Sequence, residues 1–202
     1  MRFINAGLIA CALAALPAHG ATIFSENFDE LTAALGVTSA GGFQAVGGTN
    51  VDIVGAGDGF GALCAGPESG NCIDLDGTGG NSQGVLQTVN PITLVAGTNY
   101  FLSFDLIGSQ RGVSTSTTVT LGSFSQTFTL ASGDDTDGIV VNALVTGSGP
   151  ANLTFTSNTP GAEGAILDNV LITTTPEPST MILMGSAMLG LGLLARRRAT
   201  RV

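Results

Sequence analysis

The stretch from residue 21 to residue 174 contains no segment in which apolar side chains recur every three or four positions, as they do on an amphipathic helix. Its apolar residues alternate instead with Ser, Thr and Asn over short runs, and glycine-rich turns separate the runs. We therefore predict an all-β domain over residues 21–174, an antiparallel β-sandwich with a jelly roll as the first choice of topology. The clearest predicted strands are 99–107, 123–130, 139–145, 151–157 and 165–172.

These predicted strands differ in how apolar they are. The run 123–130 alternates Phe, Gln, Phe and Leu with Ser and Thr, which is typical of a strand with one buried face. The runs 139–145 and 165–172 are apolar almost throughout, so we expect both to be central strands. Residues 31–35 could form one helical turn.

Charge is distributed very unevenly along the chain. Residues 21–174 contain fourteen Asp or Glu side chains and one basic side chain, Arg111, so their net charge is 1 − 14 = −13. A domain with this charge repels phosphate backbones and lacks the Lys and Arg that release counterions from them. We therefore expect no nucleic-acid partner.

The same residues lack the side chains that most enzymes use. They contain no His and no Lys, which excludes Ser-His-Asp, Cys-His and Ser-Lys catalysis and histidine-based zinc sites. A carboxylate pair could still hydrolyse a glycosidic bond, but the chain has no Trp to line the cleft that such a site usually needs. We therefore expect that the protein is not an enzyme.

Two groups of acids have simpler explanations. Asp74 and Asp76 alternate with apolar residues, which predicts an outward-facing strand surface. The segment 134–138 resembles the start of an EF-hand loop. It lacks the Glu at the twelfth position and the flanking helices, so we interpret it as a solvated turn.

Residues 1–20 are predicted to be a signal peptide. Arg2 gives a positive start, residues 3–16 are apolar except for Asn5, and residues 17–20 supply a break and small side chains before a cut after Gly20. The alternative is a lipid-modified Cys11. It is disfavoured because the apolar run before Cys11 is short and continues beyond it.

Cys64 and Cys72 are eight positions apart and flank a loop that contains Pro and Gly. In an exported protein such a pair is expected to form a disulfide, whereas a metal or thiol-redox site would need further partners. A loop this short should stabilise the fold by less than the ~3 kcal/mol expected for a fifteen-residue loop.

The last segment, residues 175–202, has three parts in order. They are Pro176, Glu177 and Pro178, then an uncharged apolar run, then Arg196, Arg197 and Arg198. A helix over 179–195 would be roughly 25 Å long, enough for a bilayer core, with the arginines on the cytoplasmic side. A buried helix of a soluble domain is the alternative, and it fails because a helix that is apolar all round has no face for water.

This combination of a Pro-Glu-Pro motif, one apolar helix and a terminal arginine cluster resembles the PEP-CTERM sorting signal. The resemblance implies export across the inner membrane of a Gram-negative bacterium that makes exopolysaccharide, with the tail as a transient membrane anchor. It also implies processing near the Pro-Glu-Pro motif by an exosortase, a membrane cysteine transpeptidase-like enzyme. The outer domain would then reach the cell surface or the extracellular matrix.

The domain itself resembles the jelly-roll domains that often accompany this tail and are distantly related to carbohydrate-binding modules. In those modules a structural calcium often joins the first strand to an Asp of the last strand. The resemblance therefore implies a structural calcium near Glu26 and Asp168. We expect that the protein requires no cofactor. The resemblance rests on the phrases at 26–29, 51–55, 72–77, 87–88, 96–105 and 167–170.

Two functions remain for such a protein. The first is an exported, exosortase-sorted structural protein of the cell surface or of an extracellular matrix, associated with exopolysaccharide or biofilm. The alternative is a carbohydrate-binding module-like protein that binds an exopolysaccharide. That alternative needs an exposed aromatic ring for a pyranose to stack on, and only Tyr100 and the phenylalanines could provide one.

Overall fold

The computed structural model describes residues 20–55, 60, 63–64, 70–79, 83–134, 139–144, 148–174 and 186, with the backbone alone for 139–144. The predicted signal peptide therefore lies outside the described residues except for Gly20, and the predicted helix over 179–195 lies outside them except for Ser186. Gly20–Thr175 form one compact unit by themselves. Among the described residues we find no helix with the length and hydropathy that a membrane-spanning segment needs.

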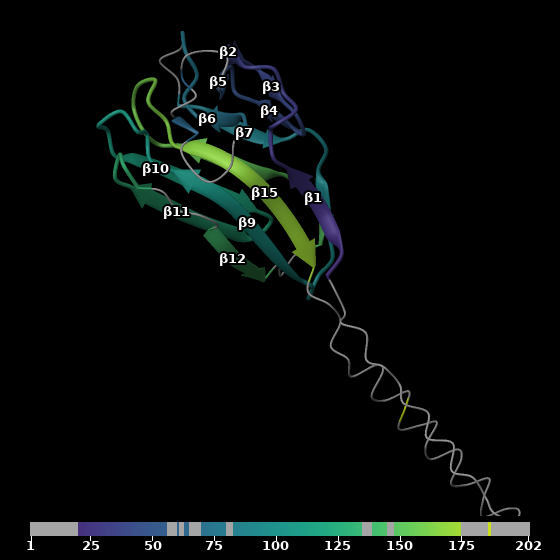
Figure 1. The fold of residues 1–202 in the computed structure, drawn as a ribbon. Coiled ribbons are helices and arrows are strands. Elements are labelled where there is room, and N and C mark those ends of the chain that lie inside the picture. Colours follow the sequence, from purple (N-terminus) through teal and green to yellow (C-terminus); the bar gives the residue numbers. More distant parts are fainter. Residues whose placement is uncertain are drawn as a thin grey trace, which may run out of the picture. The chain divides into compact units, whose positions relative to one another are not determined.

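The compact unit is built from antiparallel strands arranged in two large sheets and one small sheet (Figure 1). The first sheet has the order β12-β9-β15-β6-β5-β2, with β1 also paired to β15; the second has the order β11-β10-β14-β7-β4-β3; β13 pairs with β8. This architecture confirms the predicted all-β sandwich. The strands are β1 (Thr22–Glu26), β2 (Ala34–Val37), β3 (Ser39–Ala40), β4 (Phe43–Ala45), β5 (Val51–Val54), β6 (Cys72–Asp74), β7 (Val85–Thr88), β8 (Ile92–Leu94), β9 (Asn99–Ile107), β10 (Thr115–Leu121), β11 (Phe124–Leu130), β12 (Ile139–Leu144), β13 (Gly149–Ala151), β14 (Leu153–Ser157) and β15 (Ile166–Thr174).

The core lies between the two large sheets and is built by alternation along each strand. In β9 every second side chain from Tyr100 to Leu106 is buried. Phe104 from this strand packs edge-on against Phe155 of β14 at 5.2 Å and against Phe128 of β11 at 5.5 Å between ring centroids. Edge-to-face aromatic pairs add to the stabilisation that burial alone provides, so Phe104 joins the two sheets.

β15 is a central strand, as predicted. It pairs with β9 along one side and with β6 and β1 along the other. A bulge interrupts its pairing with β9 between Asp168 and Leu171, and Asn169 there has a φ of 50°. Asn tolerates this left-handed conformation better than most residues, and the extra residue returns Val170 to the core side of the sheet.

Two local predictions were wrong. The run 139–145 was expected to be central, but β12 lies at the edge of the first sheet and pairs with β9. An apolar run shows that a strand contacts the core but does not show how many neighbours it has. Residues 34–37 form strand β2, which pairs with β5, in place of a helical turn over 31–35. Gly36 in that strand has a φ of 64°, a value that a helical turn does not use.

A second, smaller apolar cluster lies on the outer face of the first sheet. It consists of Val54, Leu63, Cys72, Ile107 and Ile166, with Cys64 packed against it. The predicted disulfide between Cys64 and Cys72 is present, with an S–S distance of 2.02 Å. The bridge therefore ties Cys64, in the loop between β5 and β6, to the first residue of β6.

Removing this bridge should have a moderate effect. Replacing Cys64 and Cys72 together with Ser is expected to lower the free energy of unfolding by about 2 kcal/mol, because the closed loop is short and restricts few unfolded conformations. Urea unfolding of the wild type and the double variant, both in non-reducing buffer, measures the difference. A loss as large as that of a core truncation would show instead that the bridge supports the whole outer cluster.

Candidate functional site

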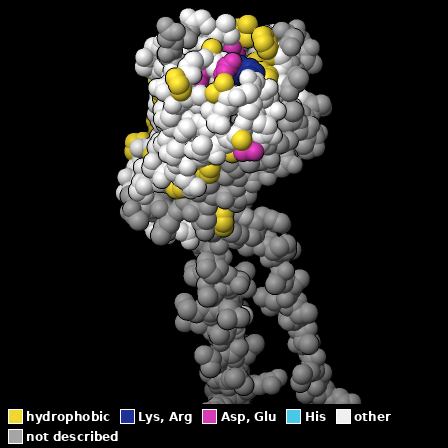
Figure 2. Space-filling model, turned by 90° about the vertical axis from the view of Figure 1, so that its left-hand side faces the viewer, with side chains coloured by type: hydrophobic (Ala, Val, Ile, Leu, Met, Phe, Trp, Pro, Cys, Tyr) yellow, Lys and Arg dark blue, Asp and Glu magenta, His cyan; other side chains and the backbone are white. Residues whose placement is uncertain are grey.

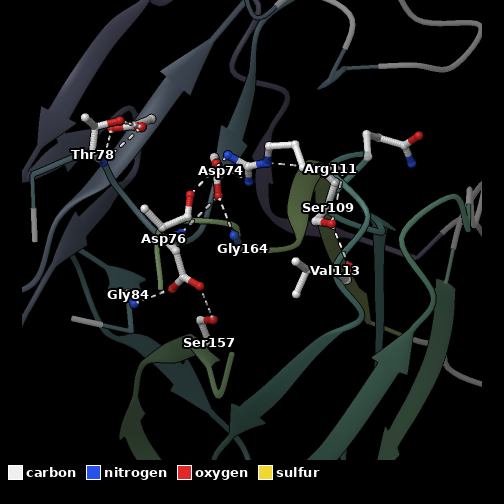
Figure 3. A network of polar contacts seen from close by, with 12 residues as sticks. Asp74, Asp76, Thr78, Gly84, Ser109, Arg111, Val113, Ser157 and Gly164 are labelled. Carbon is white, nitrogen blue, oxygen red and sulfur yellow. Dashed lines mark hydrogen bonds and ion pairs between the residues drawn. The ribbon is translucent and has the colours of Figure 1, made fainter. Parts of the chain in front are cut away.

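Three carboxylates, those of Asp52, Asp74 and Asp76, are buried at one end of the first sheet, and Figure 3 shows Asp74 and Asp76 with their partners. Asp52 of β5 lies directly opposite Asp74 of β6, and Asp76 follows two residues later. Asp74 and Asp76 are 1% and 0% exposed. The predicted outward-facing surface is therefore wrong, because other segments cover this end of the strand and β6 ends before Asp76.

Asp74 is held by one cation and two backbone amides. Its Oδ2 lies 2.6 Å from Nη2 of Arg111, and its Oδ1 accepts hydrogen bonds from the N–H groups of Asp76 and Gly164, each at 3.1 Å. Burial raises the pKa of Asp74 to about 6, although Arg111 and the Asp76 amide pull in the opposite direction. A Cβ at position 164 would lie 2.5 Å from the backbone nitrogen of Asp76, so this approach requires glycine.

Arg111 connects this carboxylate to two loops. Its Nη1 donates to the carbonyl oxygen of Ala162 at 3.0 Å, and its Nε donates to the carbonyl oxygen of Ser109 at 3.2 Å. In Figure 2 the dark-blue patch is Arg111, since no other Lys or Arg belongs to the described residues, and acidic and hydrophobic side chains surround it. The one basic residue of the domain therefore neutralises a buried acid, and a single guanidinium fixes the loops that carry Ser109 and Ala162.

Asp76 joins the two large sheets. Its Oδ1 accepts a hydrogen bond from the N–H of Gly84 and its Oδ2 accepts one from Oγ of Ser157 in β14, both at 2.9 Å. Burial raises the pKa of Asp76, and these two hydrogen bonds oppose the rise. A Cβ at position 84 would overlap the carbonyl oxygen of Leu75, so Gly84 is needed for the N–H to reach the carboxylate.

Asp52 completes the group in a similar way. Its Oδ1 accepts the N–H of Gly36 at 2.6 Å, and its Oδ2 accepts the hydroxyl of Thr78 at 2.5 Å. Every carboxylate oxygen of these three acids therefore accepts at least one hydrogen bond from the protein. Such saturated groups hold loops and strands in place, and this arrangement indicates a structural role for the cluster.

The two predicted calcium ligands are not brought together. Glu26 lies opposite Val170, whose side chain is in the core, and its Oε2 accepts the N–H of Gly42, in the turn between β3 and β4, at 2.7 Å. Asp168 lies opposite Asp105. Each of them is one position away from a core residue in its strand, so both side chains lie on the outer face of the first sheet.

The residues present therefore do not fit one shared ion. The Oε1 of Glu26 also accepts a hydrogen bond, from the N–H of Phe28 at 3.2 Å, and the Oδ1 of Asp168 accepts the N–H of Asn169 at 2.7 Å. Across the part of the chain that the structure describes, no three Asp, Glu, His or Cys side chains form a group that could hold a metal ion. Calcium binding by this domain stays a prediction without a supported pair of ligands.

Other predicted positions can be placed only in part. Asp134 accepts the N–H of Ala131 at 2.7 Å through its Oδ2, as expected for a turn at the start of 134–138. The sorting-motif residues Pro176, Glu177 and Pro178 and the arginines Arg196, Arg197 and Arg198 lie outside the described residues, as does Cys11.

The aromatic side chains are used mainly for packing. Tyr100 is 2% exposed, and its hydroxyl accepts the N–H of Val95 at 2.9 Å. Among the described aromatic residues only Phe60, at 42%, is exposed. A row of exposed rings for stacking pyranoses is therefore not present in the described part of the domain. The remaining rings that pack together are Phe24, Phe28, Phe43, Phe104, Phe128 and Phe155.

The outer face of the second sheet has a different character, which was not predicted from the sequence. Ten outward-pointing side chains on five neighbouring strands are all uncharged, eight of them hydroxyls and two amides, and we call this surface the hydroxyl face. The alternation of Thr and Ser in 115–129 was a signal for it. Its residues are Ser125, Thr127 and Thr129 of β11, Ser116, Thr118 and Thr120 of β10, Thr154 and Thr156 of β14, Gln87 of β7 and Gln44 of β4.

Comparison with solved structures shows the fold. The chain is similar to a xylan-binding domain of carbohydrate-binding module family 22, with 12% identity, a TM-score of 0.52 and coverage of 80% of this chain and 99% of that one. It is similar to part of a Clostridium thermocellum xylanase structure that contains a family 22 module and a GH10 module, with 15% identity and a TM-score of 0.52, where 78% of this chain spans 29% of that chain. It is also similar to a Stig cyclase from Fischerella, with 17% identity, a TM-score of 0.53 and coverage of 78% and 99%.

At these identities the likeness establishes the jelly-roll fold and no shared activity. No curated protein matches the chain. The C-terminal segment does match a family model: residues 174–198 carry the PEP-CTERM protein-sorting motif. The chain is therefore an exported protein with a carbohydrate-binding-module-like jelly roll and a C-terminal PEP-CTERM sorting signal.

Proposed function

We propose that this protein is a structural component of the cell surface or extracellular matrix, delivered there after an exosortase removes its tail. The main support for this proposal is the position at which the sorting motif begins. β15 ends at Thr174, and the matched motif starts at that residue. A cut near Pro176 would therefore leave every strand of both sheets in the released domain.

The domain suits such a role because it carries a strong negative charge and because its three buried acids are hydrogen-bonded within the fold. Its fourteen acids against one Arg give it a strong negative charge, which keeps copies apart in solution. The three buried acids use their hydrogen-bonding capacity inside the fold. Neither feature depends on a substrate.

A block of processing tests the proposal. Replacing Pro176, Glu177 and Pro178 together with Ala is expected to leave the full-length chain in the membrane fraction, with at least a tenfold loss of released domain, because the enzyme reads this motif. Fractionation followed by intact-mass measurement gives the amounts and the cleavage position.

The matched control is Glu163→Gln, which removes one acid from a loop of the domain and should leave processing unchanged. Equal release of the domain from the control and from the triple variant would contradict the proposal.

Binding of a carbohydrate is the second candidate function, and the hydroxyl face favours it. Eight hydroxyls and two amides on one sheet surface can donate and accept hydrogen bonds without attracting ions. A glycan array probed with protein recovered from the cell surface tests this function. Binding to none of the glycans would leave the structural role alone.

A further inference from the structure

We propose that the hydroxyl face is a docking surface for an uncharged polysaccharide. The inference rests on the second candidate function and names the surface and the chemical class of its ligand. The face spans β11, β10, β14, β7 and β4, the neighbouring strands that make up most of the second sheet. Their outward side chains are half-buried or exposed, and no described segment covers them.

The register of the strands arranges these side chains in rows. Thr118 lies opposite Thr127 on one side and Thr156 on the other, while Thr120 lies opposite Ser125 and Thr154. Neighbouring strands are about 4.8 Å apart, and side chains on one face repeat about every 6.8 Å along a strand. The result is a two-dimensional array of hydroxyls, which continues into the amides of Gln87 and Gln44.

The array is partly preorganised. The hydroxyls of Thr118 and Thr127 lie 2.8 Å apart in a hydrogen bond, and Nδ2 of Asn158 donates to Oγ1 of Thr118 at 2.8 Å. Each hydroxyl keeps further donor or acceptor capacity after these contacts. Side chains that are already ordered lose less conformational entropy when a ligand binds.

Charge and polarity decide which partner fits. The domain has a net charge of −13, yet none of its fourteen acids lies among the ten residues of this face. An acidic polymer would be repelled by the rest of the domain, and a nucleic acid would find no cation on the face. Protein interfaces need an apolar centre, whereas the apolar side chains that the register adds, Val85, Val46 and Val89, lie in or beside β7 and β4, away from the hydroxyls of β10 and β11.

A neutral polysaccharide meets all of these conditions. It carries no charge, it presents many hydroxyls that donate and accept, and it can lie along a flat surface. Its contacts with Thr side chains would combine hydrogen bonds to the hydroxyls with packing on the methyl groups. Exposed aromatic rings would not be required.

The experiment compares two matched pairs of threonines in protein recovered from the cell surface. The first variant, Thr118→Ala with Thr127→Ala, removes a cross-strand pair from the hydroxyl face. The control, Thr22→Ala with Thr173→Ala, removes a cross-strand pair from the other large sheet. The probes are soluble xylan and dextran as uncharged polymers and alginate as an anionic one, measured by affinity electrophoresis at physiological salt.

We expect retardation by at least one uncharged polymer, a loss of at least tenfold in affinity in the first variant, and wild-type affinity in the control. Unchanged melting temperatures in both variants show that the fold is intact. Binding to alginate alone, an equal loss in both variants, or no binding to any polymer would overturn the proposal. The amount of each variant at the cell surface is measured separately, so a failure to bind polysaccharide is distinguishable from a failure of sorting.

Discussion

Replacing Arg111 with Met should lower the free energy of unfolding by about 3 kcal/mol at pH 7, the lower end of the range for breaking a buried ion pair. The variant leaves Asp74, which is 1% exposed, without its cation. It also removes the hydrogen bonds that hold the carbonyl oxygens of Ala162 and Ser109. The lower end applies because the side chain of Arg111 is 24% exposed, so water screens part of the interaction. Urea unfolding followed by circular dichroism gives the value.

The loss of unfolding free energy in Arg111→Met should depend on pH in a defined direction. Burial raises the pKa of Asp74 from its ordinary 3.8 to about 6, so the folded state binds this proton more tightly than the unfolded state does. The raised pKa of Asp74 therefore stabilises the folded state fully below pH 3.8, and this stabilisation is lost as pH rises through about 6. Asp76, whose pKa is also raised by burial, acts in the same direction. Without Arg111 the ionised carboxylate is disfavoured further, so the difference between variant and wild type should be smaller at pH 5 than at pH 7.

A double variant supplies the control. Asp74→Asn combined with Arg111→Met removes the buried charge together with its partner, and it should recover most of the stability lost in Arg111→Met at pH 7. A loss in the single variant that is the same at pH 5 and pH 7, with no recovery in the double variant, would show that Arg111 acts only through its loop contacts.

Replacing Phe104 with Ala should be the most damaging change in the core, at about 4 kcal/mol. Phe104 is 0% exposed and packs against Phe128 and Phe155, so its removal leaves a cavity between the sheets and ends both ring contacts. Urea unfolding at pH 7 measures this loss from the shift in the midpoint. The slope of the unfolding free energy against urea concentration should be the same in both proteins.

Phe101 provides the matched control in the same strand. It is half-buried and alternates with the core residues of β9, so its ring lies on the outer face of the sheet. Phe101→Ala should cost less than half as much as Phe104→Ala. Equal losses at the two positions would mean that the core does not centre on Phe104.

The strands with clear alternation could be predicted from the amino-acid sequence. The predicted run 99–107 coincides with β9, and 123–130 differs from β11 by one residue. The strand period of two places side chains on opposite faces without reference to the rest of the chain, so a single strand reveals its own buried side. The sorting motif was also evident, because it depends on the order of local segments and not on folding. The disulfide followed from spacing and export.

Which strands are neighbours and which surfaces are covered depends on contacts between distant segments, so both became evident only in the folded domain. Sequence could not place β12 at the edge of the first sheet, because pairing is a contact between distant segments. Asp74 was predicted to face solvent, but Arg111, thirty-seven positions away in the sequence, covers it. Glu26 and Asp168 appeared close because their strands meet, but the bulge and the register set their side chains on opposite faces. The hydroxyl face likewise exists only because antiparallel pairing aligns five separate strands, and side-chain alternation within each strand cannot specify that alignment.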